Sequence, residues 1–307
     1  MHYSRREILK LSSLAGLGLT TLPSLFSFSI KESIHQRAIP SSGEQLPIVG
    51  LGTWLTFDIG NSSEALKVRQ QVLLEMHKLG GKVIDSSPMY GSSEATVGKV
   101  SAALDSQNSF FYATKVWTSG KQAGIDQMNS SLKKMRRSTM DLMQIHNLVD
   151  WQTHVKTLRA WKETGKIRYW GLTHYVNSAH ETLEKIIRQE KPDFVQFNYS
   201  ILSRHAEKSL LDTCQQNRTA VIINQPYDSG SLFRKVKGRS LPGWSSDYDI
   251  KSWGQYFLKF ILSHEAVTCA IPGTSKPHHV IDNMMAGYGA LPDTSGREKM
   301  VSYLKSL

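Results

Sequence analysis

Short apolar runs alternate along this chain with segments of helical periodicity, and this alternation constrains the fold more than any other feature. The runs end near Gly52, Asp85, Lys115, His146, Leu172, Gln196, Asn224 and Pro272. The helical patterns cover about 63–79, 92–104, 121–137, 154–164, 178–190, 205–216, 252–264 and 277–286. Strands that alternate with helices form a parallel sheet, so the pattern predicts an α/β fold, a (β/α)₈ TIM barrel whose active site lies at the carboxyl ends of the strands.

The size and composition of the chain fit one barrel-sized domain. It has 307 residues, 40% of them hydrophobic, which is enough for a large core. The net charge of +11 is scattered, and no nucleic-acid-binding motif accompanies it, so nucleic acid is not a predicted partner. Cys214 and Cys269 lack metal-ligand spacing, and we interpret them as buried small hydrophobes. Whether they form a disulfide stays open, and no metal site is predicted.

The first 29 residues differ from the rest of the chain. A charged segment, 4–10, precedes an apolar stretch, 11–22, that is too short to span a bilayer comfortably. Arg5 and Arg6 resemble the twin-arginine translocation signal, which implies handling by that translocation machinery, a periplasmic location and no stable membrane association after processing. The alternatives are a helical cap or an uncleaved anchor, with a cytoplasmic location if the signal is not used.

Three segments follow from this division. Residues 1–29 form the expected signal peptide, 30–48 a polar linker and short hairpin, and 49–307 the barrel. Within the barrel, the connection 228–250 exceeds the usual loop length, so it is either a functional flap or an irregular insertion.

Four polar residues lie at or just past the carboxyl ends of three successive runs: Asp85, Tyr90, Lys115 and His146. Because the active sites of such barrels lie at this face, we expect the four side chains to lie close together. Three of them have an ordinary structural interpretation when taken alone: Asp85 as a helix cap, Lys115 as a surface charge and His146 as a core histidine. Their joint placement favours a catalytic site.

The four side chains suit the protonation of an oxygen while hydride arrives at the attached carbon. A phenol has an unperturbed pKa of about 10, so Tyr90 needs help to donate a proton near neutral pH. A lysine ammonium about 4 Å away, at an effective dielectric constant of about 20, favours the phenolate by roughly 4 kcal/mol before desolvation opposes it. We therefore predict that Lys115 lowers the pKa of Tyr90. Asp85 would keep Lys115 charged, and His146 would orient the carbonyl oxygen.

From about residue 36 to residue 286 the chain resembles the aldo-keto reductase family. The matching segments are 50–54, 83–91, 113–115, 144–147, 171–173, 195–199 and 271–274. The resemblance implies an NADPH-dependent oxidoreductase that reduces an aldehyde or ketone to an alcohol with an Asp, Tyr, Lys, His tetrad. All four positions of that tetrad are present.

The resemblance also implies a set of residues that hold the cofactor. They are Thr53, Trp54, Thr173, His174, Gln196, Asn224, Gln225, Pro226, Tyr227, Thr274, Ser275, Lys276, His279, Asp282 and Asn283. Gln196 would hold the nicotinamide carboxamide, but His174 replaces the usual asparagine. Asn224 stands where many members stack an aromatic ring, and Tyr227 is the nearest aromatic residue.

At the adenosine end, Thr274, Ser275 and Lys276 suit a 2′-phosphate. His279 replaces a commonly basic arginine, so NADPH is the expected cofactor and NAD is less expected. The plainer alternative is a capped helix. The basic residues of 228–250, which are Arg234, Lys235, Lys237 and Arg239, would by resemblance neutralise the pyrophosphate, or else form a solvated loop.

Aromatic residues after the strands suggest the class of substrate. Trp54, Trp117, Phe233 and Trp244 are candidates for pocket walls, which would favour an apolar or aromatic carbonyl compound, although each also suits a core.

A second hypothesis is a nucleotide-binding or regulatory protein with little turnover, because Asn224 and His174 depart from the family pattern. A metal-dependent hydrolase would need more clustered ligands than His146 and Asp85. The oligomeric state and the recycling of an exported cofactor stay open.

Overall fold

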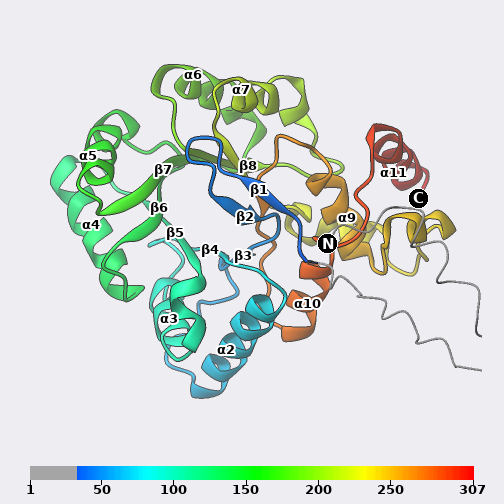
Figure 1. The fold of residues 1–307 in the computed structure, drawn as a ribbon, viewed down its shortest axis with the longest axis horizontal. Coiled ribbons are helices and arrows are strands. Elements are labelled where there is room, and N and C mark those ends of the chain that lie inside the picture. Colours follow the sequence, from blue (N-terminus) through cyan, green and yellow to red (C-terminus); the bar gives the residue numbers. More distant parts are fainter. Residues whose placement is uncertain (1–32) are drawn as a thin grey trace, which may run out of the picture. The chain divides into compact units, whose positions relative to one another are not determined.

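The computed structural model describes residues 33–307, and its parallel strands form a closed barrel (Figure 1). The strands are β3 (Leu51–Gly52), β4 (Val83–Asp85), β5 (Phe111–Val116), β6 (Met140–His146), β7 (Ile167–Thr173), β8 (Phe194–Asn198), β9 (Ala220–Asn224) and β10 (Cys269–Ala270). They pair in sequence order from β3 to β10. Two bridges, Val49 to Ala270 and Gly52 to Gly273, join the first and last strand segments and close the sheet. The predicted (β/α)₈ barrel is confirmed.

Helices follow the strands and surround the barrel (Figure 1). The barrel helices are α2 (Ser63–Lys78), α3 (Ser93–Ser101), α4 (Lys121–Lys134), α5 (Trp151–Glu163), α6 (His180–Glu190), α7 (Leu210–Gln216), α9 (Trp253–Leu262) and α10 (Pro277–Met285). Each predicted helix has a counterpart within a few residues, except that 205–216 begins as the 3₁₀ turn His205–Lys208 before α7. The structure adds α8 (Ser231–Lys235) inside the long connection and α11 (Thr294–Ser306) at the carboxyl end. None of the helices within residues 33–307 has the length and apolar character needed to cross a membrane.

The interior of the barrel changes from apolar to polar along the strands. An apolar cluster inside it contains Val83, Ala113, Leu142, Phe194 and Ile222, one from each of five strands. Side chains two residues apart on a strand point to the same face. The residues two positions further on are Asp85, Lys115, Gln144, Gln196 and Asn224. The alternation therefore places a polar layer on the apolar one, at the carboxyl end of the barrel.

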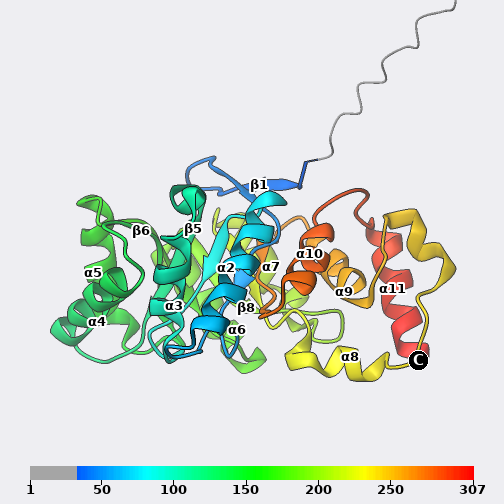
Figure 2. The same ribbon diagram turned by 90° about the horizontal axis from the view of Figure 1, so that it is seen from below.

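A β-hairpin closes the amino end of the barrel. It consists of β1 (Gln36–Ala38) and β2 (Gln45–Pro47), which pair antiparallel, and Ile39 and Leu46 are buried in the apolar interior. Arg37 anchors the hairpin by donating to the carbonyl oxygens of Leu262, His264 and Val267 at and just after the end of α9. Figure 2 shows the hairpin at one end of the barrel and α8 at the other. Access to the interior is therefore from the carboxyl end.

Both cysteines are buried and free. Cys214 lies in α7 and Cys269 in β10. The interpretation of these residues as small buried hydrophobes is confirmed, and they do not pair with each other. The proposed signal segment, residues 1–29, lies outside the described residues.

Candidate active site

A buried ion pair forms the centre of the polar layer. Lys115 Nζ on β5 lies 2.6 Å from Asp85 Oδ2 on β4 and donates a second hydrogen bond of 2.6 Å to the carbonyl oxygen of Ser86. The side chain of Lys115 is 0% exposed and that of Asp85 is 3% exposed. Burial by itself lowers the pKa of Lys115, but the attraction of Asp85 and the contact with Tyr90 outweigh it and raise the pKa. Lys115 is therefore an ammonium at neutral pH.

Two glutamine side chains complete the surroundings of the Asp85 carboxylate. Gln144 Nε2 on β6 and Gln196 Nε2 on β8 each donate to Asp85 Oδ1 over 3.0 Å. With Lys115 on the other oxygen, the buried carboxylate accepts three hydrogen bonds, which offset the cost of removing it from water. Gln144 was not among the residues predicted from sequence. Two signals could have found it: it lies in the matching segment 144–147, and it is two residues before His146 on the same face of β6.

Tyr90 lies above the ion pair but is less acidic than predicted. Lys115 Nζ is 5.1 Å from the centroid of the Tyr90 ring. Burial raises the pKa of Tyr90, Lys115 opposes this increase, and the net pKa is above its usual value. Lys115 thus lowers this pKa as predicted, but its effect does not bring the net pKa toward neutrality, because desolvation of the phenolate outweighs the attraction of the ammonium. Tyr90 is a protonated phenol in the free protein.

His146 ends β6 beside the tyrosine. Its ring centroid is 5.9 Å from that of Tyr90, with the rings edge to face, and 6.3 Å from a ring of Trp117. Burial, together with the nearby Lys115 and His174, lowers the pKa of His146 to about 3. Its Nδ1 atom lies 3.0 Å from Ser87 Oγ, a residue that the sequence did not single out. The imidazole is therefore neutral and has a hydrogen bond on one nitrogen.

The four residues Asp85, Tyr90, Lys115 and His146 are thus together at one end of the barrel. The arrangement holds a neutral phenol and a neutral imidazole beside a buried ammonium. Such a set can donate hydrogen bonds and a proton to an oxygen and can stabilise the phenolate that remains. Within residues 33–307, no three His, Cys, Asp or Glu side chains converge to hold a metal ion.

The side chains expected at the nicotinamide form a second network. Thr173 Oγ1 donates to Gln196 Oε1 over 3.1 Å, and Asn224 Nδ2 donates to the carbonyl oxygen of His174 over 3.0 Å. Asn224 Oδ1 is buried without a hydrogen-bond partner in the described part of the chain. Since a buried polar atom is costly when unpaired, this oxygen marks a place for a ligand donor.

Five other residues expected at the cofactor lie just after the ends of β3, β7 and β9. Thr53 Oγ1 donates to the carbonyl oxygen of Asp85 over 2.9 Å, so Thr53 supports the ion pair, while Trp54 is half exposed. The ring of His174 stacks on Tyr175. Gln225 and Pro226 continue the turn after Asn224, where Gln225 has a positive φ of 48°.

Tyr227 and the adjoining part of α10 are engaged with protein rather than free for a ligand. The hydroxyl of Tyr227 donates to Asn283 Oδ1 over 2.6 Å, and its ring packs 4.8 Å from that of Phe233. Asp282 accepts hydrogen bonds from Ser252 Oγ and Gln255 Nε2. These three expected cofactor residues therefore join α10 to the segments before it in the free protein.

The expected 2′-phosphate site lies where α10 begins. Lys276 precedes Pro277 at the helix start, and the amide of Lys276 donates to Thr274 Oγ1 over 3.1 Å. The Lys276 ammonium has no hydrogen-bond or ion-pair partner in the stretch 33–307. Burial, then His278 and Lys276, lower the pKa of His279, so it is uncharged near neutral pH. Lys276 is thus the cation that remains for a phosphate.

Arg69 was not predicted, yet it organises this region. From α2, its Nε donates to the carbonyl oxygen of Thr56 over 2.5 Å and its Nη1 to that of Ser275 over 3.2 Å. It therefore ties the loop after β3 to the loop after β10.

The long connection is also folded rather than irregular: Leu232 and Ile250 are buried, and its four basic side chains are exposed around α8.

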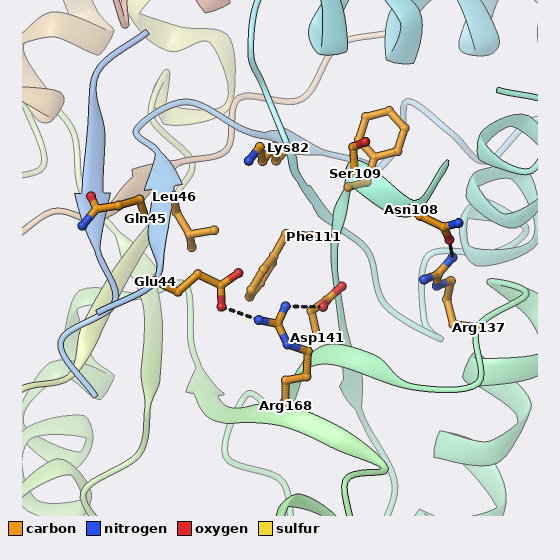
Figure 3. Close-up of a pocket in the computed structure, with 11 residues that line it drawn as sticks. Glu44, Gln45, Leu46, Lys82, Asn108, Ser109, Phe111, Arg137, Asp141 and Arg168 are labelled. Carbon is orange, nitrogen blue, oxygen red and sulfur yellow. Dashed lines mark hydrogen bonds and ion pairs between the residues drawn. The ribbon is translucent and has the colours of Figure 1, made fainter. Parts of the chain in front are cut away.

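A hollow of about 360 Å³ lies at the opposite, amino end of the barrel (Figure 3). Figure 3 shows Arg168 between Glu44 of the hairpin and Asp141 of β6. Arg168 pairs with Asp141 over 2.7 Å and also with Glu44. Because these charges neutralise one another and join the hairpin to the strands, the hollow is a structural feature remote from the four catalytic candidates.

Comparison with known proteins identifies the family. A model described as the aldo/keto reductase family matches residues 48–295. The chain belongs to the aldo/keto reductase family. Among curated members, it is 27% identical over 259 residues to a methylglyoxal reductase of Escherichia coli. The alignment covers 81% of this chain and 89% of that protein. It is also 27% identical over 229 residues to an NADH-specific methylglyoxal reductase of E. coli, covering 64% and 68%.

Solved aldo/keto reductases share the barrel. One from Klebsiella pneumoniae, in complex with NADP and acetate, matches with a TM-score of 0.72 at 23% identity and covers 85% of this chain and 93% of that one. Another from the same organism, in complex with NADPH, has a TM-score of 0.73 at 21% identity and covers 89% and 95%. At these identities the likeness is one of fold.

Proposed function

We propose that this aldo/keto reductase uses NADPH to reduce an aldehyde or ketone to an alcohol. The observation that carries the proposal is the buried Asp85–Lys115 pair with Tyr90 and His146 beside it at the open end of the barrel. NADPH supplies the hydride when bound. Tyr90 donates the proton to the carbonyl oxygen, and His146, being neutral, donates a hydrogen bond that orients the same oxygen.

Because the pKa of Tyr90 is raised in the resting protein, Lys115 acts when the proton leaves Tyr90 in the transition state. The phenol keeps its proton in the resting protein, because burial disfavours the phenolate. As the proton leaves, the ammonium stabilises the phenolate by roughly 3 to 4 kcal/mol at 4 to 5 Å and an effective dielectric constant of about 20. Asp85 keeps Lys115 charged throughout. This stabilisation is larger in the transition state than in the ground state, as catalysis requires.

The residues present fit a nicotinamide dinucleotide. Asn224 Oδ1 supplies an unpaired buried acceptor near Gln196 and Thr173, where a carboxamide N–H would bind. At the start of α10, Lys276 offers a free ammonium for a 2′-phosphate. Lys276 supports NADPH over NADH. The neutral His279 makes that preference smaller than an arginine would, and a relative of this chain is NADH-specific.

Exposed apolar side chains support a substrate with an apolar or aromatic body. Residues 33–307 hold eight large exposed hydrophobic side chains, and seven lie in segments that follow strand ends: Trp54, Leu55, Met89, Trp117, Tyr175, Leu202 and Phe233. They surround the open end of the barrel, where such a surface favours binding of an apolar compound. Trp244, a fourth candidate from the sequence, instead packs 6.0 Å from Tyr256 and Tyr303.

The test is replacement of Tyr90 by Phe. We expect a folded variant that binds NADPH but oxidises it at least about 100-fold more slowly with methylglyoxal and with an aromatic aldehyde, because the proton donor is gone. Tyr303→Phe, on α11, is the matched control and should retain the parental rate. Parental turnover by the Tyr90 variant would refute the proposal. Running NADH beside NADPH measures the cofactor preference in the same assay.

A nucleotide-binding or regulatory protein with little turnover is the second candidate. It is favoured by Asn224, which replaces a stacking ring, and by Gln196, whose amide is already bonded to Asp85. Saturable NADPH binding by fluorescence, without oxidation across a broad panel of aldehydes and ketones, would select this alternative.

We also propose that residues 1–29 direct export by the twin-arginine route, based on Arg5 and Arg6 ahead of the apolar stretch. Replacing both arginines by lysine should shift the protein from the periplasmic to the cytoplasmic fraction. An unchanged distribution would contradict the proposal.

A further inference from the structure

We propose that Ser87 is a positioning residue: its hydroxyl fixes which nitrogen of His146 carries the proton and so turns Nε2–H toward the substrate. This inference rests on the proposed function, in which His146 donates a hydrogen bond to the carbonyl oxygen. Ser87 follows β4, two residues after Asp85, and it is fully buried. Its Oγ atom lies 3.0 Å from His146 Nδ1.

The surroundings of Ser87 determine the direction of this hydrogen bond. The backbone N–H of Met89 donates to Ser87 Oγ over 3.4 Å, so the hydroxyl oxygen already accepts one hydrogen bond. Within residues 33–307, no acceptor other than His146 Nδ1 faces the hydroxyl. If the imidazole donated instead, the buried hydroxyl hydrogen would have no acceptor among the described residues, which is unfavourable. Ser87 therefore donates, and Nδ1 accepts.

This direction decides what His146 presents to a carbonyl. A neutral imidazole carries one proton, so an Nδ1 that accepts leaves the proton on Nε2. Nε2–H can donate to a carbonyl oxygen, whereas the other tautomer would direct a lone pair at it. The proton on Nε2 is therefore required for the proposed role of His146.

No other group in the described structure performs this task. Tyr90 and Trp117 contact the imidazole through their rings, which restrict its plane but not its tautomer. Ser87 is the one hydrogen-bond partner of the His146 side chain between residues 33 and 307. Because it acts through His146 and does not touch the reacting atoms, its effect appears in the tautomer and in turnover.

The experiment combines nitrogen NMR with kinetics. In the parent, the ¹⁵N spectrum of His146, assigned with a His146→Gln variant, should show a neutral ring protonated at Nε2. Ser87→Ala should yield a mixture of tautomers and a kcat lower by roughly ten- to a hundred-fold, the range for a misaligned hydrogen-bond donor, with the KM for NADPH unchanged. Ser87→Thr keeps the hydroxyl and should restore both values. Ser131→Ala, a buried serine on α4, is the matched packing control.

Three results would overturn the inference. They are an Nδ1–H imidazole in the parent, a Ser87→Ala variant with the parental tautomer and kcat, and one in which kcat falls while the tautomer stays unchanged. If Ser87→Ala does not fold, the spectrum of the parent still tests the direction of the bond. The failure of the proposed function is distinguishable, because it appears as parental turnover in Tyr90→Phe whatever the tautomer of His146.

Discussion

Lys115 and His146 lie in the same buried layer, and burial affects their charges with different outcomes. Asp85 contacts Lys115 directly, so the pKa of the lysine rises in spite of desolvation. Within residues 33–307 no carboxylate contacts His146, so burial, together with repulsion by Lys115, lowers its pKa to about 3. The layer thus holds one fixed positive charge beside two neutral hydrogen-bond donors.

The pKa of His146 makes stability depend on pH. The folded protein keeps His146 neutral down to about pH 3, while the unfolded chain binds its proton near the usual pKa of 6.5. Below pH 6.5 the unfolded state therefore binds more protons, and the stability present above that value is lost as the pH falls toward 3. His146 contributes a slope of up to about 1.4 kcal/mol per pH unit.

We expect His146→Gln to reduce this dependence. Urea unfolding at pH 7 and pH 5 should show a smaller loss of unfolding free energy in the variant than in the parent. Equal losses in the two proteins would show that His146 is not buried neutral.

For single residues, the sequence predicts where side chains lie better than it predicts their pKa values. The strand ends placed Asp85, Tyr90, Lys115 and His146 together because strand periodicity and barrel topology suffice for that. The effect of Lys115 on the pKa of Tyr90 was predicted, but the net increase was not, because desolvation depends on what covers the phenol, which the sequence does not show. Gln144 lies in the matching segment 144–147 but was assigned no role, although its amide donates to the same carboxylate as Lys115.

Among the elements, the β1–β2 hairpin has the most specific anchor. Carbonyl groups at the carboxyl end of a helix lack intrahelical partners, and Arg37 supplies donors to three carbonyls at and after the end of α9. Ile39 and Leu46 then fill the floor of the barrel. One side chain thereby joins the hairpin to the last helix before β10.

Arg37→Ala should destabilise the protein by about 2 to 4 kcal/mol, because it leaves buried carbonyls unpaired and loosens the hairpin. Urea unfolding measures the loss. Lys156→Ala, on the exposed face of α5, should change stability by less than about 0.5 kcal/mol. Equal effects of the two substitutions would contradict the anchoring role.

Helices that belong to the regular strand–helix repeat were predicted, whereas helices outside it were missed. Helices after strands were predicted within a few residues because period and alternation both indicate them. α11 was missed because it follows no strand and lies outside the repeating pattern, although Asp293 caps it by accepting from Gly296. α8 was missed because five residues are too few for a periodic signal.

For the whole molecule, one of the two bridges that close the barrel is formed by a pair of glycines. Gly52 pairs with Gly273 across the junction of the first and last strands. A Cβ atom at Gly52 would lie 2.8 Å from the carbonyl oxygen of Ile271, so any larger residue forces the backbones apart. The loop tie made by Arg69 lies just above this seam.

Gly52→Ala should therefore lower the free energy of unfolding by roughly 1 to 3 kcal/mol, the cost of overpacking. Amide hydrogen exchange should increase most around β3 and β10, where the seam opens. Gly243→Ala, which meets open space, is the matched control and should leave both measurements unchanged. Unchanged exchange at the seam in the Gly52 variant would contradict this account of closure.

The alternation of apolar and polar layers inside the barrel has a consequence for misfolding. Ala113 and Lys115 point inward because both belong to the same parity of β5, and each neighbouring strand follows the same rule. A slip of one residue in the pairing of β5 would turn Lys115 out of the polar layer toward the helices, and a slip in a neighbouring strand would displace its polar side chain in the same way. Misregistered molecules could keep a normal circular dichroism spectrum and still be inert, so specific activity is a stricter test of correct strand pairing than secondary-structure content.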